Sequence, residues 1–254
     1  MKTPKEGAVA IITGAGRGIG EATAYRYAEA GMSLLILDKD GAAAETVAEA
    51  IRASGGHAVS LAIDLRDEDA PGRMVRATID AFGRIDVLVN NAGIAPLIGF
   101  LETTREQLRE LMAINFEMQF TATQAVVRQL IDQGEGGCII NLGTVNALVG
   151  VNRTAAYAGS KGALIAFTRA LAVELAPYQI RVNALAPGTI RTARVVAALT
   201  EDDFRRRIER IPAGRLGTEA DVTGCALFLV GPDAGFVNGH VLVADGGFSI
   251  LGTF

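Results

Sequence analysis

Tyr157 and Lys161 lie four residues apart in the stretch AAYAGSKGALIAFTRALAVEL. The stretch is typical of a helix, so we expect the two side chains on one helix face, one turn apart. A phenol loses its proton near pH ~10, and an ammonium group close to it favours the phenolate. At ~4 Å and an effective dielectric constant of ~20, this attraction is about 4 kcal/mol, or up to about three pKa units. The spacing predicts a tyrosine that exchanges a proton with an alcohol or ketone. The alternative is a surface lysine beside a half-buried tyrosine.

The composition limits the class of protein. The chain has 254 residues, 50% of them hydrophobic, with a net charge of −4, two Cys and two His. This length suits a single α/β domain over residues 1–254. The charge gives no case for a nucleic-acid partner, and no apolar run has the length of a membrane span. Cys and His are too few for a disulfide framework or a metal site built on them. The first apolar run is too short for a signal peptide, so we expect a cytoplasmic protein without a metal.

Seven short apolar runs alternate with helical stretches along the chain. The runs lack polar alternation, which indicates strands buried on both faces of a parallel sheet. The sequence therefore predicts an α/β fold, a single Rossmann-type doubly wound domain with about seven parallel strands flanked by helices on both faces. The segment 189–217 is arginine-rich and weakly periodic, and we expect it to form a variable lid over the ligand site. Strands are expected at 8–13, 33–38, 58–64, 87–93, 138–143, 180–188 and 240–247, and helices at 19–30, 41–54, 67–82, 104–132, 156–176 and 218–230.

A glycine-rich turn joins the first predicted strand to the first predicted helix. Its glycines allow a sharp turn and a close approach of the backbone to a pyrophosphate, which the helix N-terminus would attract. Their spacing is Gly-x-x-x-Gly-x-Gly and not the more familiar Gly-x-Gly-x-x-Gly. The position between strand and helix predicts a dinucleotide site. Its residues are Gly14, Gly16, Arg17, Gly18, Ile19 and Gly20.

Asp38 stands at the end of the second predicted strand. A carboxylate there can accept hydrogen bonds from a ribose diol and would repel a 2′-phosphate. Arg17 and Lys39 oppose this preference, because either can pair with that phosphate. We expect NAD as the cofactor, with NADP as the alternative; Asp38 has a second possible role as the N-cap of the following helix. Asp64, which closes the third strand, is expected beside the adenine or as the cap of the next helix.

Further motifs stand in a fixed order along the chain: Thr13–Gly20, Asp64-Leu65, Asn90-Asn91-Ala92-Gly93, Asn115, Tyr157-x-x-x-Lys161, Asn183, Pro187-Gly188 and Asp245-Gly246-Gly247. Taken together, these motifs resemble those of the short-chain dehydrogenase/reductase family, in order and spacing, over essentially the whole chain. The resemblance implies an NAD(H)-dependent oxidoreductase that transfers a hydride between nicotinamide and a secondary alcohol or ketone.

The same resemblance implies roles for single residues. Tyr157 would be the general acid in ketone reduction and the general base in alcohol oxidation. Lys161 would lower the pKa of Tyr157 and hydrogen-bond the nicotinamide ribose. Asn115 would hold a water that connects Lys161 to solvent. Besides the residues named above, cofactor contacts are expected from Leu65, Asn90, Asn91, Ala92, Gly93, Pro187, Gly188, Ile190 and Thr192.

Thr144 departs from the family pattern, in which a serine usually stands thirteen residues before the tyrosine. Thr keeps the hydroxyl that holds a substrate oxygen, adds a methyl group and restricts χ1. We expect a working catalytic Thr144; an impaired or repurposed site is the rival. A mainly apolar lining suits a small or medium-sized alcohol or ketone. Substrate contacts are expected from Ile94, Thr144, Asn146, Asn152 and Tyr157, beside Ala95, Pro96, Leu97, Val145, Ala147, Leu148, Arg153 and parts of 190–210.

Two further enzyme and binding functions stay open at the level of sequence. The lid arginines either pair with neighbouring acids or dock an acidic acyl carrier protein, which would make the enzyme an NADPH-dependent 3-oxoacyl-[acyl-carrier-protein] reductase. A dinucleotide-binding protein without catalysis is a third possibility, favoured by Thr144 alone. These lid arginines are Arg191, Arg194, Arg205, Arg206, Arg207 and Arg210, and the acids are Glu201, Asp202, Asp203 and Glu209.

The quaternary state is predicted indirectly. Helices 104–132 and 156–176 carry apolar residues on more than one face, so part of that surface must meet something beyond its own sheet. The family resemblance implies a homotetramer built on these helices. The apolar tail 248–254 is expected to pack at another subunit interface.

Overall fold

Seven parallel strands form one sheet in a computed structural model that describes residues 7–251. The first six and the last three residues of the chain, including the end of the apolar tail, lie outside the described part. The strand order is β3-β2-β1-β4-β5-β6-β7, and neighbouring strands pair in parallel throughout, which confirms the predicted fold. The strands are β1 Val9–Thr13, β2 Ser33–Asp38, β3 His57–Ala62, β4 Val87–Asn90, β5 Gly137–Leu142, β6 Ile180–Pro187 and β7 Val241–Ala244.

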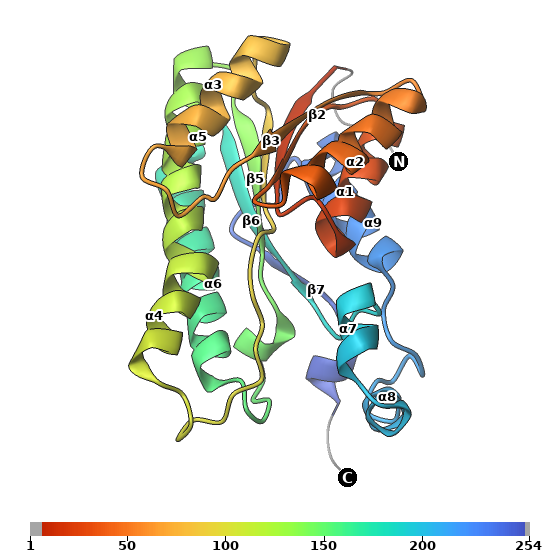
Figure 1. Cartoon of the computed structure of the whole chain (residues 1–254). Helices are drawn as coiled ribbons and strands as arrows, with labels where there is room; N and C mark the ends of the chain where they lie inside the picture. Colours follow the sequence, from red (N-terminus) through yellow and green to blue (C-terminus); the bar gives the residue numbers. More distant parts are fainter. Residues whose placement is uncertain (1–6, 252–254) are drawn as a thin grey trace.

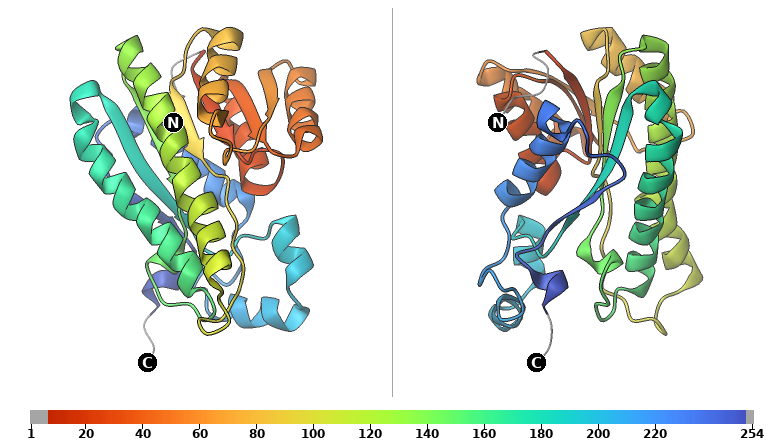
Figure 2. Two further views of the ribbon diagram at one scale, coloured as in Figure 1. Left: turned by 60° about the vertical axis from the view of Figure 1, so that its left-hand side comes forward. Right: turned by 180° about the vertical axis from the view of Figure 1, so that it is seen from behind.

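Helices cover both faces of the sheet (Figure 1, Figure 2). Helices α3, α5 and α6 lie on one face, and α1, α2 and α9 lie on the other. The main helices are α1 Gly18–Glu29, α2 Gly41–Ala53, α3 Ala70–Phe82, α4 Arg105–Met112, α5 Met118–Gln133, α6 Ala155–Glu174 and α9 Glu219–Val230.

The five inner strands are buried on both faces, as their apolar runs predicted, whereas the edge strands β3 and β7 are only partly buried. Successive side chains of a strand point to opposite faces of the sheet. Ile12 accordingly packs in the core under α1, α2 and α9, whereas Ile11 packs in the core under α3, α5 and α6. In β2, Ile36 packs in the same core as Ile12, and Leu37 packs in the same core as Ile11. The sheet thus lies between two separate apolar cores, so a functional site can form only at the ends of its strands.

The strand order reverses between β1 and β4. In an open α/β sheet, the crevice outside the carboxyl ends of strands at such a reversal is the usual ligand site. Thr13 ends β1 and Asn90 ends β4, so the glycine turn and the segment after Asn90 border this crevice together.

The predicted helix 104–132 contains a π-helical turn, Ala113–Glu117, between α4 and α5. A π-turn inserts one residue into the helical hydrogen-bond ladder, and such turns occur mostly at functional sites. Apolar periodicity does not reveal it, because the helical pattern continues on both sides. Asn115 is its central residue.

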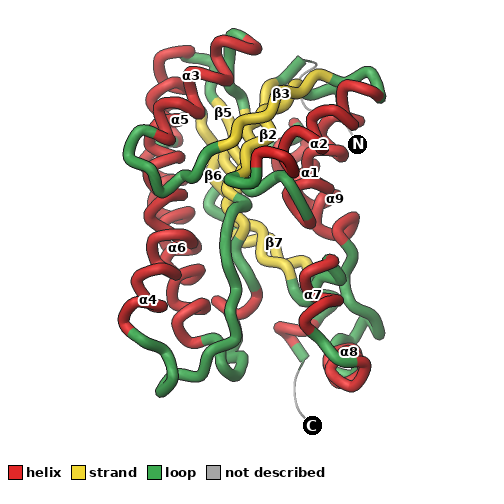
Figure 3. The backbone as a smooth tube through the Cα atoms, in the orientation of Figure 1, coloured by secondary structure: helices red, strands yellow, loops and turns green. Residues whose placement is uncertain are grey.

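The segment 189–217 folds into two short helices, α7 (Ala193–Ala198) and α8 (Glu201–Ile208), joined by loops (Figure 3). Its ends are held together, because Gly217 N donates to Thr189 O and Arg191 N donates to Gly217 O. Thr192 Oγ1 caps α7 by accepting from Val195 N, and Thr200 caps α8. The lid is therefore an ordered excursion between β6 and α9.

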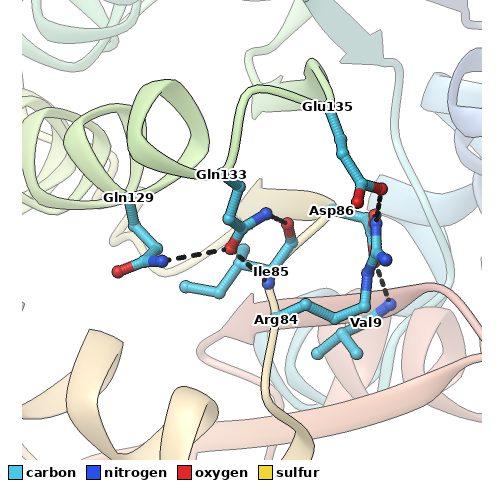
Figure 4. A network of polar contacts seen from close by, with 7 residues as sticks. All are labelled: Val9, Arg84, Ile85, Asp86, Gln129, Gln133 and Glu135. Carbon is cyan, nitrogen blue, oxygen red and sulfur yellow. Dashed lines mark hydrogen bonds and ion pairs between the residues drawn. The ribbon is translucent and has the colours of Figure 1, made fainter.

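A polar network closes the opposite, amino end of the sheet (Figure 4). Asp86 Oδ2 accepts from Val9 N at 2.8 Å and from Arg84 Nε at 2.9 Å. Gln133 brackets Ile85, accepting from its N–H at 3.0 Å and donating to its carbonyl at 2.7 Å. These contacts tie β1, β4 and α5 together far from the glycine turn, so they serve the fold and leave the other end free for the site.

Candidate active site

Lys161 is buried beneath the carboxyl end of β5. Its position on α6 brings Nζ to 2.7 Å from the carbonyl of Leu142, the last residue of β5. Only 4% of the residue is exposed. Burial disfavours the ammonium form and lowers the pKa of Lys161 from 10.5 to about 8.

Tyr157 lies one turn earlier on α6, half-buried. Burial raises the pKa of its phenol, while a hydrogen bond with Thr144 and the positive charge of Arg194 act to lower that pKa. The expected net lowering by Lys161 is wrong for this structure, because the cost of burying a phenolate exceeds these two effects. The proximity of Thr144 to the phenol oxygen is what the sequence predicted.

Thr144 follows β5 in an extended conformation and is 7% exposed. Its hydroxyl accepts from Asn146 N at 3.3 Å, capping a single 3-10 turn. The same hydroxyl is the hydrogen-bond partner of Tyr157. One hydroxyl therefore joins the end of β5 to the start of α6 and faces the crevice with the phenol.

Asn115 holds the opposite wall in place. Its side chain is fully buried, accepts from Ile94 N at 2.9 Å and donates to Ile94 O at 2.9 Å. Its amide also donates to Ser160 Oγ at 3.0 Å, and Ser160 Oγ donates to the Tyr157 carbonyl at 2.8 Å. Asn115 thus joins the loop after β4 to α6. The sequence argument missed Ser160, although its position between the tyrosine and the lysine was a usable signal.

Asn90 lies deeper than predicted. It is fully buried, and its amide donates to Thr123 Oγ1 and Asn141 Oδ1, both at 2.8 Å. Asn141 donates in turn to Thr168 Oγ1 at 2.9 Å. The expectation that Asn90 lines the cofactor is wrong for its side chain, which belongs to an interior network between β4, β5, α5 and α6. Asn90 Oδ1 and Gln119 Oε1 have no partner within residues 7–251.

The glycine turn packs against the segment after β4. A Cβ at Gly14, where φ is +63°, would lie 2.8 Å from Ala92 Cα. A Cβ at Gly20 would lie 2.3 Å from Gly14 O and 2.5 Å from Asn91 Nδ2. Asn91 Nδ2 donates to the carbonyls of Thr13 and Gly14 at 2.8 and 2.9 Å. Both glycines are therefore required by close packing, and Asn91 shapes the turn.

Asp38 faces the same turn. Its carboxylate accepts from Gly16 N at 3.0 Å and from Asp40 N at 3.0 Å, and the residue is 8% exposed. Asp40, and not Asp38, is the N-cap of α2, accepting from Ala43 N. The capping alternative for Asp38 is thereby removed.

Three other residues from the predicted cofactor set already have partners. Arg17 pairs with Asp40 at 2.8 Å, both side chains being exposed. Asp64 pairs with Arg66, which lowers the pKa of Asp64 to about 2, and it is not the cap of α3, which is Asp69. Leu65 is 5% exposed and belongs to the apolar core.

The start of the lid closes the crevice from the β6 side. Pro187 ends β6, Ile190 is 4% exposed within the core, and Thr192 caps α7. A Cβ built on Gly18 would lie 3.8 Å from Thr192 Cγ2. The lid therefore begins directly beside the glycine turn, while Gly188 is packed against Asp245.

A cavity of about 270 Å³ lies between the loop after β4, α4 and the lid. Of the predicted substrate residues, Ile94, Ala95 and Pro96 line it, whereas Thr144 and Tyr157 do not. Asn146 has its backbone amide bound to Thr144, and Asn152 is exposed in a turn; neither lines the cavity. Arg194, which the sequence grouped with the other lid arginines, does line it. The complete lining is Ile94, Ala95, Pro96, Ile98, Gln107, Glu110, Leu111 and Arg194.

The crevice has features that fit a dinucleotide. At Gly14, Gly16 and Gly20 of the turn the neighbours are too close for a Cβ. Helix α1 begins at Gly18 without a side-chain cap, so its first N–H groups are open to an anion. The Asp38 carboxylate stands beside that turn. Among residues 7–251 no group of three or more His, Cys, Asp or Glu side chains is arranged to hold a metal ion.

Comparisons with known proteins identify the family. A family model described as enoyl-(acyl carrier protein) reductase matches residues 14–249. A crystal structure of a short-chain type dehydrogenase/reductase from Mycobacterium marinum superimposes with a TM-score of 0.92 at 34% identity, covering 97% of each chain. The chain belongs to the short-chain dehydrogenase/reductase family and is an oxidoreductase of that family.

Three relatives illustrate the range of similar proteins. L-rhamnose 1-dehydrogenase (NAD(P)+) of Azotobacter vinelandii is 39% identical over 94% of this chain and 96% of its own. 2-Dehydro-3-deoxy-D-gluconate 5-dehydrogenase of Dickeya dadantii is 36% identical over 96% of each chain. A 7α-hydroxysteroid dehydrogenase complexed with NADH and 7-oxo-glycochenodeoxycholic acid has a TM-score of 0.92 at 33% identity, covering 95% and 94%. No helix in the described part of this chain is long and apolar enough to cross a membrane.

Proposed function

We propose that this protein is an NAD(H)-dependent oxidoreductase for a secondary alcohol or ketone, with Tyr157 as the general acid and base. The observation that carries the proposal is the convergence of Thr144, Tyr157 and Lys161 at the carboxyl end of β5, next to a glycine turn that fits a dinucleotide. When bound, the nicotinamide supplies or accepts the hydride.

The protein residues would handle the proton. Thr144 would hold the substrate oxygen with its hydroxyl, at hydrogen-bonding distance from the Tyr157 phenol. Tyr157 would donate its proton to that oxygen in reduction and take it back in oxidation. A lysine with a pKa near 8 is charged at neutral pH and close to exchanging its own proton, which suits the resupply of protons to the site. Throughout the reaction, Asn115 would hold the backbone of Ile94 in place through its two hydrogen bonds.

Asp38 supports NAD over NADP. Its nearly buried carboxylate lies at the end of β2 beside Gly16, where a 2′-phosphate would meet a like charge. Arg17, one of the two opposing cations, is already engaged by Asp40. Lys39 remains the residue that would favour NADP, and so NADP is kept as the alternative.

The substrate class is proposed from the lining and the relatives. Ile94, Ala95 and Pro96 make one apolar wall, which suits the carbon skeleton of a small or medium-sized ketone. Among the relatives, one is named for a sugar and another for an oxo-acid derived from a sugar. Hydroxylated and acidic ketones therefore belong in the first substrate panel.

The second candidate is an NADPH-dependent 3-oxoacyl-[acyl-carrier-protein] reductase. The description of the matching family model, which names acyl carrier protein, favours it. The lid argues against docking by its arginines, since Arg205 and Arg206 both pair with Asp202 and so are partly neutralised. A protein that binds a dinucleotide without catalysis is not favoured, because Thr144 retains its contact with Tyr157.

We also propose a homotetramer that works in the cytoplasm. Phe116 of the π-helical turn, Phe120 of α5 and Phe167 of α6 form an aromatic cluster. Phe120 is 41% exposed, so a partner subunit would cover it. The free thiols of Cys138 and Cys225 suit a reducing compartment. A stable monomer in light scattering would refute the proposed tetramer.

The test begins with fluorescence titration of the purified protein with NADH and NADPH. Turnover is then measured with each cofactor against ketones, sugars and acyl thioesters. Tight NADH binding with turnover of a ketone or sugar is expected. NADPH preference with acyl thioester turnover would replace the proposal by the second candidate. Nucleotide binding with no turnover of any panel member, under both cofactors, would count against the catalytic assignment.

A further inference from the structure

Arg194 is bonded differently from the other described lid arginines. Arg205 and Arg206 pair with Asp202, and Arg207 donates to Thr189 Oγ1 at 3.3 Å. Two more stack on lid or tail rings, Arg191 over Phe204 and Arg210 over Phe248. These five keep their contacts within the lid or with the short turn after β7, and Arg215, near the end of the lid, pairs with Asp221 of α9 at 2.7 Å.

Arg194 instead reaches across the crevice. Its Nη2 donates to the carbonyl of Ala95 at 3.1 Å, in the loop after β4. No carboxylate pairs with it in the described part of the chain, and this is its one hydrogen bond there. A guanidinium has five N–H donors, so four remain for another acceptor.

The wall that Arg194 touches is rigid. Ala95 follows Ile94, whose N–H and carbonyl are both bound by the buried Asn115 side chain. Pro96 follows directly and restricts the backbone further. Arg194 therefore stands at a fixed place on the rim of the 270 Å³ cavity that Ile94, Ala95 and Pro96 line.

The same cation lies near the reacting phenol, since its charge acts on the pKa of Tyr157. Glu110 also lines the cavity, and its negative charge acts on Arg66. A second guanidinium, that of Arg153, donates to Leu97 O at 3.4 Å and adds positive charge to the same loop. The part of the rim nearest Tyr157 thus carries the positive charge of Arg194.

We propose that Arg194 is a specificity residue that binds a carboxylate carried by the substrate, so that the preferred ketone is an oxo-acid or its hydroxy-acid partner. The proposal rests on the proposed function and names the substrate class of that site. A carboxylate accepts two parallel N–H bonds from a guanidinium, which fixes both the position and the orientation of the bound acid. A neutral ketone of the same shape would leave the four free donors of Arg194 without a carboxylate partner.

Equilibrium binding tests this without requiring turnover. Calorimetry compares 3-oxobutanoate, 4-oxopentanoate and 5-oxohexanoate with their methyl esters, each added to protein saturated with the oxidised nucleotide, so that no hydride can be transferred. At least one acid of the series is expected to bind roughly ten- to hundredfold more tightly than its ester. Arg194→Gln should remove this preference and leave ester binding within twofold, while Arg194→Lys should keep part of it.

The matched control is Arg205→Gln, an exposed lid arginine that pairs with Asp202. It should leave the acid preference unchanged. A wild-type protein that shows no preference for any acid, or binds neither acids nor esters, overturns the proposal; so does a preference that survives in Arg194→Gln. If Arg194→Gln instead weakens nucleotide binding tenfold and leaves the acid preference intact, its ligand is a cofactor phosphate and the substrate assignment is wrong.

Failure of the proposed function has a different signature. It would appear as no turnover of acids, esters or alcohols by the wild type with either nucleotide, whatever the binding preference. An acid preference in binding that depends on Arg194 would stand in that case as evidence for an anion site, and the catalytic assignment alone would fall.

Discussion

Replacing Thr144 by Val removes one hydroxyl and keeps nearly the same volume at a site that is 7% exposed. That hydroxyl hydrogen-bonds Tyr157 and acts to lower its pKa. A hydrogen bond to a charged group contributes roughly 1.5–3 kcal/mol. At ~1.4 kcal/mol per unit, its loss should raise the pKa of Tyr157 by about one to two units.

The rate should fall for a second reason. If Thr144 holds the substrate oxygen, the variant also loses one donor to that oxygen, which costs roughly 10²- to 10³-fold in kcat. Stability should change little, because the bond from Asn146 N to the hydroxyl at 3.3 Å is long and contributes about 1 kcal/mol or less.

The assay is the pH dependence of kcat/KM for alcohol oxidation. Oxidation needs the phenolate as base, so the rate falls as the pH drops through the pKa of Tyr157. In Thr144→Val the acidic limb of this pH profile should move to higher pH by one to two units, and the maximal kcat/KM should fall about 10²-fold. Thr144→Ser is the control and should stay near wild type in both respects. A Val variant with normal kcat/KM and an unmoved limb would refute the role of Thr144, provided that thermal melting shows it to be folded.

Three further changes test the site and its frame. Lys161→Met removes a buried cation whose pKa is lowered from 10.5 to about 8, which corresponds to about 3 kcal/mol. The unfolded chain keeps the lysine proton up to a higher pH than the folded chain does. The free energy of unfolding of the wild type should therefore rise by about 3 kcal/mol between pH ~8 and ~10.5, and denaturant melts of Lys161→Met should lack this rise. Asp38→Asn should raise the affinity for NADPH relative to NADH by about tenfold in fluorescence titration; an unchanged ratio would discard the argument from charge. Gly20→Ala places a methyl 2.3 Å from Gly14 O and should cost about 3 kcal/mol or more, whereas Gly224→Ala on α9, with nothing within 4 Å, should be neutral or stabilising by thermal melting.

Much of the fold could be predicted because local sequence determines it. Continuous apolar runs such as Val9–Thr13 are buried on both faces wherever they occur, and the alternation with helices leaves few topologies. The boundaries were less certain. The last strand ends at Ala244 and β4 ends at Asn90, both earlier than the apolar runs suggested, because strand pairing and not hydrophobicity ends a strand.

The identity of the residues in the site was also visible in the chain. Tyr157 and Lys161 share a helix, so their spacing fixes their common face before any tertiary contact forms. The glycine turn was visible for a similar reason, since its position between a strand and a helix is a local property. Thr144 was found by its distance from Tyr157 along the chain, and its contact with that residue is present in the structure.

The tertiary structure determined which residues each side chain contacts and how far burial shifts its pKa. Burial, which the sequence does not report, raises the pKa of Tyr157 and lowers that of Lys161. The spacing of the two residues had predicted a lowered pKa for Tyr157, because it counts the charge of the lysine and not the cost of burying a phenolate. Long-range contacts placed Asn90 in the interior and Arg194 on Ala95, residues separated from their partners by dozens of positions. Sequence patterns record which side chains are present and which helix face they share; only packing between distant segments determines how much water and charge surrounds each one.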